Sequence, residues 1–537
     1  MKLIKGKSVF GGSAIGELFI VKKVQIDIPN ASAEDTAEEL KRLHNAISDA
    51  DKKLTEHYEI AVETVGKEDA EIFEMHKLML TDEDFTDALN EKIESAKMNV
   101  LKAVDETCKE FVAFFEGLDD EYMRVRALDV RDVCALLIEI LTGVKTSNKL
   151  VSPSIVIAED LTPGETIQMD KKNILAFVLK EGSSNSHTAI LARTMGIPSI
   201  VQADFEINEL KSGVLAAVDG TQGLCYIEPN EATLTAFKEQ VEKDAVFKRE
   251  CEAMRGLPTV TKSGREIKIY ANIGCNEDIS SVLSNDAQGI GLFRSEFLYL
   301  GRDTPPNEEV QFAAYKNVAE KMQGKKVIIR TMDIGADKQV DYLGIPEEEN
   351  PALGYRAIRI CLDRRDLFQT QLRAICRASV FGNIAVMFPM ISSLWEIIEC
   401  KKSLDEAIKS LTEEKIPVGK TEIGIMIETP AAAILCDVFA KEVDFFSVGT
   451  NDLTQYTLAV DRQNQKLERY ADPYHPAILE MLSKIALCAK NNNIWAGVCG
   501  ELAGDFTMTE KFIDMGFSEL SVAPPLILPL RKAIREM

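Results

Sequence analysis

The spacing of apolar and polar residues changes twice within the first half of the chain. The first 22 residues alternate like short strands, with Gly11-Gly12 as a turn signal. From about residue 33 to 145, apolar residues recur three and four positions apart, with no proline, which predicts long helices. Strand and turn signals return in 146–230, for example at Val218-Asp219-Gly220. The pattern therefore predicts an α/β domain whose sequence is interrupted by a helical insertion.

From residue 264 onward, strand-like and helical segments alternate regularly. Eight apolar strand-like segments spread over roughly 270 residues, which is the rhythm of a (β/α)8 barrel. They are Ile267–Asn272, Gly289–Phe293, Val327–Thr331, Ile384–Pro389, Ile423–Glu428, Val443–Val448, Trp495–Cys499 and Leu520–Ala523. A doubly wound open sheet is the alternative that this pattern leaves open.

These patterns set the expected domain boundaries, and a length of 537 residues indicates several domains. Residues 1–22 and 146–230 are expected to form the α/β domain, with 23–145 as the inserted helical domain. The charged segment 231–258 is predicted to be a helical linker to a barrel formed by 259–537.

Composition and charge restrict the class of protein. The chain has 86 acidic and 62 basic residues, a formal net charge of −24, which argues against nucleic acid or an anionic membrane as partner. A basic protein partner is compatible with that charge. No run approaches the roughly 18 apolar residues of a membrane span, so we expect no membrane insertion. The eleven cysteines lack metal-ligand spacing and are typical of reduced thiols, so we expect a cytoplasmic protein.

A histidine at the tip of a small polar loop is the first candidate for chemistry. The loop Gly182-Ser183-Ser184-Asn185-Ser186-His187 runs directly into an amphipathic helical segment. Its small residues let the backbone bend around an anion, and the new helix N-terminus supplies donors. The neutral imidazole of His187 is a nucleophile that can take up and pass on a phosphoryl group. A helix cap with an exposed histidine is the alternative.

A second set of polar residues lies where the predicted barrel strands end, which is where barrels place their reacting groups. The set consists of Arg294, Arg330, Glu428, Asn451, Asp452 and Cys499, with Arg462 shortly after the sixth strand. Arginine and asparagine side chains bind phosphate and carboxylate, and two carboxylates can hold a cation such as Mg²⁺. A thiol can donate a proton. The set therefore suits a small phosphorylated acid.

Each of these residues also has a structural alternative. Arg294 with Glu296, or Arg330 with Asp333, could be ion pairs of the barrel rim. Cys499 could be a small buried apolar residue, and Glu428 could cap the helix that follows it.

Long stretches of the chain match one family in the same order. They are 158–163, 186–193, 289–298, 329–338, 353–359, 425–431, 447–456 and 499–505. On these stretches the chain resembles the phosphoenolpyruvate-protein phosphotransferase family, Enzyme I of the sugar phosphotransferase system. The chain departs from the family at Ser183-Ser184-Asn185, where Gly-Arg-Thr is more common, and at Ala336 and Tyr355, where glycine and tryptophan are more common.

The resemblance implies a reaction and roles for the candidate residues. Phosphoenolpyruvate would bind the barrel with Mg²⁺ and phosphorylate His187, which would then phosphorylate the carrier protein HPr. Glu428 and Asp452 would hold the Mg²⁺, and Cys499 would protonate the enolate to give pyruvate. The phosphoenolpyruvate site would consist of Arg294, Arg330, Asn451, Asp452 and Arg462. The resemblance also implies a homodimer formed through the barrel domain.

The helical insertion resembles the HPr-binding domain of that family. Phe73, His76 and Leu80 share one helical face, and the acidic run Asp82-Glu83-Asp84 follows. Apolar and acidic side chains would complement the basic and apolar surface that HPr presents. An ordinary surface position is the alternative for His76.

Two other classes of protein are compatible with parts of the pattern. Pyruvate phosphate dikinase and phosphoenolpyruvate synthase share the histidine domain and the barrel, but this sequence has no Walker-type glycine loop. A non-catalytic sensor of phosphoenolpyruvate or HPr is the other alternative, and the joint presence of His187, Glu428, Asp452 and Cys499 weighs against it.

Overall fold

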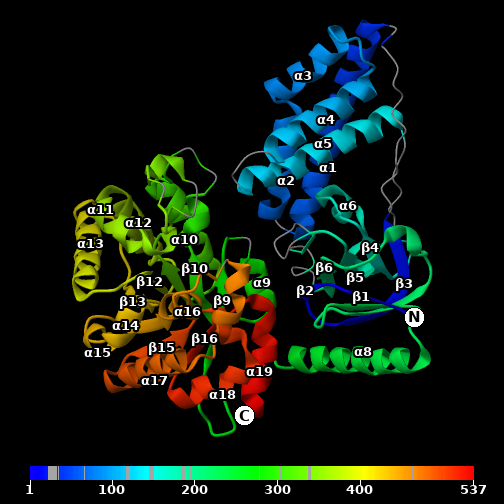
Figure 1. Ribbon diagram of the computed structural model, residues 1–537. Helices are drawn as coiled ribbons and strands as arrows, with labels where there is room; N and C mark the ends of the chain where they lie inside the picture. Colours follow the sequence, from blue (N-terminus) through cyan, green and yellow to red (C-terminus); the bar gives the residue numbers. More distant parts are fainter. Residues whose placement is uncertain are drawn as a thin grey trace. The chain divides into compact units, whose positions relative to one another are not determined.

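The protein is described by a computed structural model in two compact units, Met1–Phe247 and Lys248–Met537 (Figure 1). Each unit is treated by itself. The structure describes the whole chain except residues 22–32, 34, 66, 117–120, 144–149, 151, 183–187, 190, 191, 193–195, 277, 301, 303, 337–339, 347 and 463.

One mixed sheet unites the two ends of the first unit's sequence. Its strands are β1 (Lys2–Lys5), β2 (Lys7–Phe10), β3 (Ser13–Val21), β4 (Ser154–Ala158), β5 (Ile174–Leu179), β6 (Ser199–Val201), β7 (Leu215–Asp219) and β8 (Leu224–Ile227). Their order is β1-β8-β7-β3-β4-β5-β6-β2. β3 pairs in parallel with β4, Leu18 lying opposite Ile155, although the helical segment separates them in sequence. The predicted α/β domain with a helical insertion is confirmed.

The insertion consists of five helices around their own apolar core. They are α1 (Thr36–Val65), α2 (Lys67–Leu80), α3 (Glu83–Glu94), α4 (Val100–Glu116) and α5 (Glu121–Thr142). α1 packs on α2 and α4 packs on α5. The acidic run lies where α3 begins, and Asp82 caps that helix by accepting a hydrogen bond from the Phe85 amide at 3.1 Å.

The face formed by Phe73, His76 and Leu80 points into this core. The three residues are only 1%, 3% and 0% exposed. The ring of His76 has its Nε2 3.3 Å from Oδ1 of Asp129 on α5. Both expectations for this face, a docking surface and an ordinary surface position for His76, are therefore wrong. An apolar stripe on a helix within a bundle is buried against its neighbours.

The second unit is a closed barrel of eight parallel strands, and the open-sheet alternative is wrong. The strands are β9 (Lys268–Ile273), β10 (Gly289–Arg294), β11 (Lys326–Arg330), β12 (Ile384–Phe388), β13 (Glu422–Ile427), β14 (Phe445–Val448), β15 (Trp495–Val498) and β16 (Glu519–Val522). β16 pairs with β9 and closes the ring. Each lies within two residues of a predicted strand, because parallel barrel strands are continuous apolar runs.

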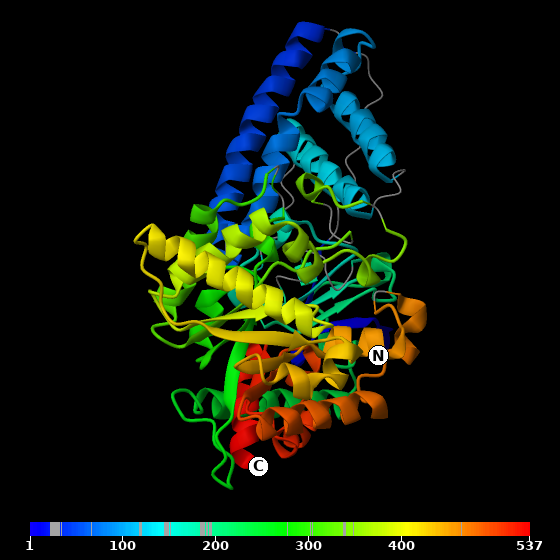
Figure 2. The ribbon, with the colours of Figure 1, turned by 90° about the vertical axis from the view of Figure 1, so that its left-hand side faces the viewer.

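Helices surround the barrel (Figures 1 and 2). They are α9 (Ile279–Ser284), α10 (Glu308–Lys321), α11 (Ile358–Asp363), α12 (Arg365–Ala378), α13 (Leu394–Glu413), α14 (Pro430–Ile434), α15 (Cys436–Phe439), α16 (Thr450–Leu458), α17 (Pro476–Asn491), α18 (Phe506–Met515) and α19 (Ile527–Glu536). In the first unit, α6 (Pro163–Gln168) follows β4. The helix α8 (Glu231–Glu252) begins in the first unit, ends in the second, and occupies the segment predicted as a helical linker. None of the described helices has the length and apolar character needed to cross a membrane.

Candidate active site

The carboxyl ends of the barrel strands bring together the candidate residues predicted there. Arg294 and Arg330 are the last residues of β10 and β11 and lie opposite each other in the register. The others follow β13, β14 and β15 directly or within the next helical turn: Glu428, Asn451, Asp452 and Cys499. Because all strands are parallel, these ends meet at one face of the barrel.

A buried chain of ion pairs orients Arg330. Its Nη2 lies 3.1 Å from Oε1 of Glu296, and its Nη1 lies 2.9 Å from Oδ2 of Asp333. Asp333 also accepts a hydrogen bond from Nη2 of Arg356 at 2.8 Å. The ion-pair alternative is therefore correct for Arg330 and Asp333, whereas Glu296 pairs with Arg330 and not with Arg294. Paired carboxylates keep two buried guanidinium groups in place, and a fixed guanidinium can bind an anionic ligand.

Arg356 was missed as a site residue, although it lies within a stretch that carries the family resemblance. Besides Asp333, its guanidinium contacts the hydroxyl of Tyr456, with Nη1 donating at 3.3 Å. The next residue, Ala357, has a φ of 52°, a conformation that is costly for a residue with a Cβ. This turn directs the side chain of Arg356 toward Asp333. The role of Arg356 is indicated by its pairing with Asp333, and the sequence does not specify that pairing.

Glu428 is a buried carboxyl group directly after β13. Its Oε1 accepts a hydrogen bond of 2.6 Å from the amide of Met390, which has a φ of 57°. Burial raises the pKa of Glu428 to about 8, and the charges of Asp452 and Asp333 act in the same direction. The helix-cap alternative is wrong, because the hydroxyl of Thr429 caps α14 instead.

The surroundings of Glu428 and Asp452 fit a hard cation. Both side chains offer carboxylate oxygens as metal ligands, and the repulsion between the two carboxylates is relieved when a cation lies between them. A Cβ at Gly449 would come within 3.1 Å of Oε2 of Glu428, so this oxygen points at the end of β14 that leads to Asp452. Within the described ranges, no group of three or more His, Cys, Asp or Glu side chains could hold a metal ion. A cation held by these two carboxylates would need further ligands from substrate or water.

Asn451 and Arg462 line a hollow at the rim of the barrel. It has a volume of about 400 Å³, and its lining includes Tyr474 and Glu501 as well. The amide Nδ2 of Asn451 donates to Oε1 of Glu501 at 3.0 Å. Arg462 places Nη2 3.4 Å from Oδ1 of Asp452. The hollow is thus next to one of the two carboxylates.

Cys499 is 3% exposed, and its thiol lies 3.5 Å from the carbonyl oxygen of Val448. Burial raises the pKa of this thiol to about 12, so it is protonated at neutral pH. Burial and the capacity to donate a proton are therefore compatible for Cys499.

His187 lies outside the described residues, as do Ser183 and Ser184. Described residues on both sides of them are fixed to the α/β domain. The hydroxyl of Thr188 donates to the carbonyl oxygen of Leu161 at 3.3 Å, and the carbonyl oxygen of Gly182 accepts from Gln202 at 3.3 Å.

Comparison with known proteins agrees with this architecture. Three family models match: PEP-utilising enzyme, N-terminal, over 5–126; PEP-utilising enzyme, mobile domain, over 150–223; and PEP-utilising enzyme, PEP-binding domain, over 248–537. The phosphoenolpyruvate-protein phosphotransferase of Priestia megaterium is 41% identical over 539 residues, which cover 100% of this chain and 94% of that protein. That of Bacillus subtilis (strain 168) is 39% identical over 540 residues, covering 100% of this chain and 95% of that protein. The chain belongs to the phosphoenolpyruvate-protein phosphotransferase family.

Proposed function

We propose that this enzyme transfers the phosphoryl group of phosphoenolpyruvate to its own His187 and then to a histidine of HPr, releasing pyruvate. This is the first step of the sugar phosphotransferase system. The observation that carries the proposal is the fixed, buried Arg330 beside two carboxylates and a protonated thiol at one end of the barrel.

The cationic side chains bind the substrate. Arg294 and Arg330, at adjacent strand ends, contact the phosphate and carboxylate of phosphoenolpyruvate, and Asn451, Asp452 and Arg462 complete its site from the rim. Fixed donors stabilise charge as it builds on the transferred phosphoryl group and on the enolate oxygen. The ion pairs of Arg330 supply this fixed geometry before substrate arrives.

Glu428 and Asp452 hold Mg²⁺ in this proposal. The bound cation supplies electrostatic stabilisation of the transferred phosphoryl group. A bound cation would favour the ionised form of Glu428, whose pKa burial otherwise raises to about 8, and the Met390 amide holds Oε1 of this carboxyl group in place.

Cys499 completes the reaction at carbon. When the phosphorus–oxygen bond breaks, the phosphoryl group goes to His187 and the enolate of pyruvate remains. The S–H proton of Cys499 is then transferred to the terminal carbon, which gives pyruvate and a thiolate. The raised pKa of this thiol keeps the proton available at neutral pH.

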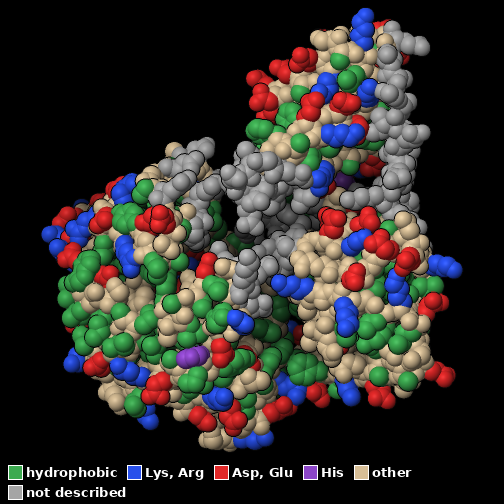
Figure 3. All heavy atoms as spheres, in the orientation of Figure 1, with side chains coloured by type: hydrophobic (Ala, Val, Ile, Leu, Met, Phe, Trp, Pro, Cys, Tyr) green, Lys and Arg blue, Asp and Glu red, His purple; other side chains and the backbone are tan. Residues whose placement is uncertain are grey.

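HPr binds the helical domain, at its solvent-facing side chains rather than at the buried Phe73 face. The run Asp82-Glu83-Asp84 is exposed, and Leu78 nearby is 70% exposed. Figure 3 shows acidic side chains gathered over the part of this domain where Figure 1 places α3. An acidic surface attracts a basic carrier.

A second copy of the chain covers an apolar face of the barrel. α13, α14, α15 and α17 neighbour one another, and α13 crosses the view of Figure 2 in yellow. The large apolar side chains exposed on these helices, or between α14 and α15, are Trp395, Ile398, Ile434, Leu435 and Leu487. Such a face on a soluble unit is typical of an oligomer interface.

The test is incubation with ³²P-labelled phosphoenolpyruvate and Mg²⁺, with and without HPr, for the parent and His187→Ala. We expect acid-labile label on the parent only, chased completely onto HPr. Absence of label on a parent that still binds phosphoenolpyruvate would favour a sensor. Label that passes to a nucleotide and not to HPr would favour the dikinase class.

A further inference from the structure

A buried carboxyl group lies inside the barrel below Cys499. Glu519, on β16, is 2% exposed, and its side chain points toward β15 and β10. A Cβ at Gly497 would lie 1.7 Å from its Oε2, and a Cβ at Gly291 would lie 2.8 Å from its Oε1. The interior therefore has room for this carboxyl group only because both facing positions are glycine.

The register places this group one step below the proposed proton donor. Gly497 lies opposite Glu519, and Cys499 follows Gly497 by two residues, on the same face of the strand. Two residues along a strand span about 7 Å. This backbone spacing leaves room for one hydroxyl group or one water molecule between the two side chains.

Polar atoms that could form such a bridge line the same interior. Oε1 of Glu519, Oγ of Ser521, Oγ of Ser447 and Oδ1 of Asn272 are buried there, and the hydroxyl groups of Ser521 and Ser447 interact with Glu519 and Cys499, respectively. Oγ of Ser521 is also close to Gly291, where a Cβ would lie 2.3 Å from it. Four buried acceptors in one apolar barrel are typical of a site that holds internal water.

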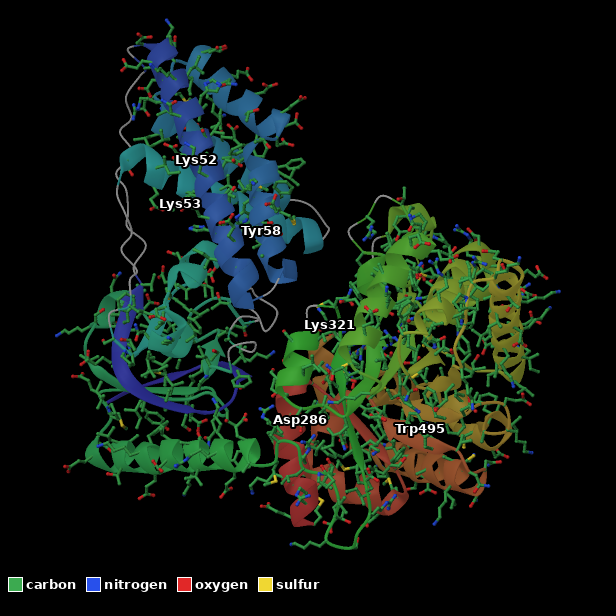
Figure 4. The ribbon with its side chains drawn as sticks, turned by 180° about the vertical axis from the view of Figure 1, so that it is seen from behind. Lys52, Lys53, Tyr58, Asp286, Lys321 and Trp495 are labelled. Carbon is green, nitrogen blue, oxygen red and sulfur yellow. The ribbon has the colours of Figure 1, made fainter. Side chains whose placement is uncertain are left out.

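The charged neighbours of Glu519 are few. Its titratable neighbours are Lys326 on β11, Tyr270 on β9 and Cys499 directly after β15. Lys326 also pairs with Glu422 at 2.7 Å, and both contact Trp495, labelled in Figure 4, where β15 begins. Burial raises the pKa of Glu519 well above its ordinary value, although Ser521 and Lys326 act in the opposite direction. Burial among apolar side chains therefore favours the protonated form of this carboxyl group.

We propose that Glu519 is the positioning residue that returns a proton to Cys499 after each turnover, through Ser521 and an internal water molecule. The inference rests on the proposed role of Cys499. Once the thiolate has formed, the O–H bond of Glu519 breaks and an S–H bond forms on Cys499. The Glu519 carboxylate, stabilised by the ammonium group of Lys326, then takes a proton from water at the amino-terminal end of the barrel.

The experiment compares the first turnover with later ones in Glu519→Gln, which keeps the shape of the side chain and removes the acid. Pyruvate is measured by rapid quench without HPr for one turnover, and by a coupled assay with excess HPr for steady state. We expect a first turnover at the parent rate, because Cys499 begins with its own proton, and later turnovers slowed about tenfold or more. Glu519→Asp should recover part of the loss, and Glu413→Gln, a control at an exposed position of α13, should behave as the parent.

Three outcomes overturn the inference. Parent-like later turnovers in Glu519→Gln would show that solvent reprotonates Cys499 directly. A first turnover slowed as much as later ones would show a structural effect, and slowed transfer of label from phosphoenzyme to HPr would place the defect elsewhere.

If Glu519→Gln does not fold, Ser521→Ala is decisive: slow later turnovers support the relay and parent-like ones exclude it. Cys499→Ala separates the two proposals, since unchanged pyruvate formation in that variant would remove the proposed role of Cys499 itself.

Discussion

Nη1 of Arg330 lies 2.9 Å from Oδ2 of Asp333, three residues further along the chain. The contact joins the end of β11 to the loop that follows, and Arg356 binds the other oxygen of the same carboxylate. One buried aspartate therefore holds two arginines whose charges would otherwise repel each other. The arrangement provides positive charge at the carboxyl end of the barrel in advance of ligand binding.

Removal of this shared carboxylate should cost both stability and substrate affinity. Asp333→Ala leaves two buried guanidinium groups without their common partner, and we expect unfolding to become easier by about 3–5 kcal/mol. The KM for phosphoenolpyruvate should rise in the same variant. Urea denaturation and steady-state kinetics measure the two effects. Asp366→Ala removes an exposed partner of Arg364 and should cost at most about 1 kcal/mol; equal losses in the two variants would contradict the argument.

Loss of a metal ligand should raise the Mg²⁺ concentration that the reaction requires and leave the fold intact. Glu428→Gln keeps the size of the side chain and its contact with the Met390 amide. We expect the Mg²⁺ concentration for half-maximal phosphorylation of His187 to rise at least tenfold, with little loss of thermal stability. The measurement is autophosphorylation from labelled phosphoenolpyruvate over a Mg²⁺ series. A parent-like Mg²⁺ dependence would remove Glu428 from the proposed site.

A buried histidine predicts an acid-sensitive helical domain. His57 on α1 packs against Gly164 of α6, where a Cβ would lie 3.4 Å from its Nδ1. Burial lowers the pKa of His57 to about 4. Lys53, labelled in Figure 4, and His76 also lower this pKa, whereas Glu139 raises it.

The sign of the pH effect follows from that depressed pKa. Unfolded histidine binds a proton near pH 6.5, whereas folded His57 does so only near pH 4, so stability is lost as the pH falls through this window. We expect His57→Gln to flatten the dependence of the free energy of unfolding on pH between 6.5 and 4. His44→Gln, at an exposed position of the same helix, is the control. Identical pH profiles for His57→Gln and the parent would refute the prediction.

The acidic run before and at the start of α3 should govern how fast HPr associates. Neutralising Asp82, Glu83 and Asp84 to their amides removes long-range attraction, so the association rate should fall several-fold at low salt and much less at high salt. Stopped-flow binding at two salt concentrations measures this. Glu510→Gln with Asp514→Asn, which neutralises exposed charges on α18, should leave the rate unchanged. If both sets of changes slowed association equally, the net charge of the protein and not the acidic run would govern the association rate.

The exposed apolar face of the barrel should mediate self-association. Trp395 is 59% exposed on α13, and a glutamate there would place a charge in the centre of an apolar contact. We expect Trp395→Glu to weaken the dimer at least tenfold in sedimentation velocity, with unchanged thermal stability of the monomer. Phe506→Glu, at a 41% exposed position on α18, is the matched control. A parent that sediments as a monomer would contradict the proposed interface directly.

The sequence by itself determined the architecture and most of the candidate site. Continuous apolar runs identified the barrel strands, because both faces of such strands are buried, and their regular alternation with helical segments separated them from the strands of the first unit. Once the strands are known, their carboxyl ends must meet at one face, and so the order of the strands was enough to group Arg330, Glu428 and Cys499. Sequence similarity then decided the family.

Only the tertiary structure decided partners and burial. Glu296 pairs with Arg330 rather than with its near neighbour Arg294, and Arg356 shares Asp333, because segments distant in sequence meet at the barrel rim. The spacing of residues on α2 predicts that Phe73 lies on an apolar face, and such a face can be a docking surface or part of a core. The packing of α2 against its neighbouring helices buries this face, and helical spacing alone does not specify that packing. Nothing in the sequence distinguishes Glu519 from the other acidic residues, and only the closed barrel places its side chain against Gly497 in the interior. Local periodicity fixes which residues share a face, whereas the dielectric environment and the charge opposite each residue depend on long-range packing.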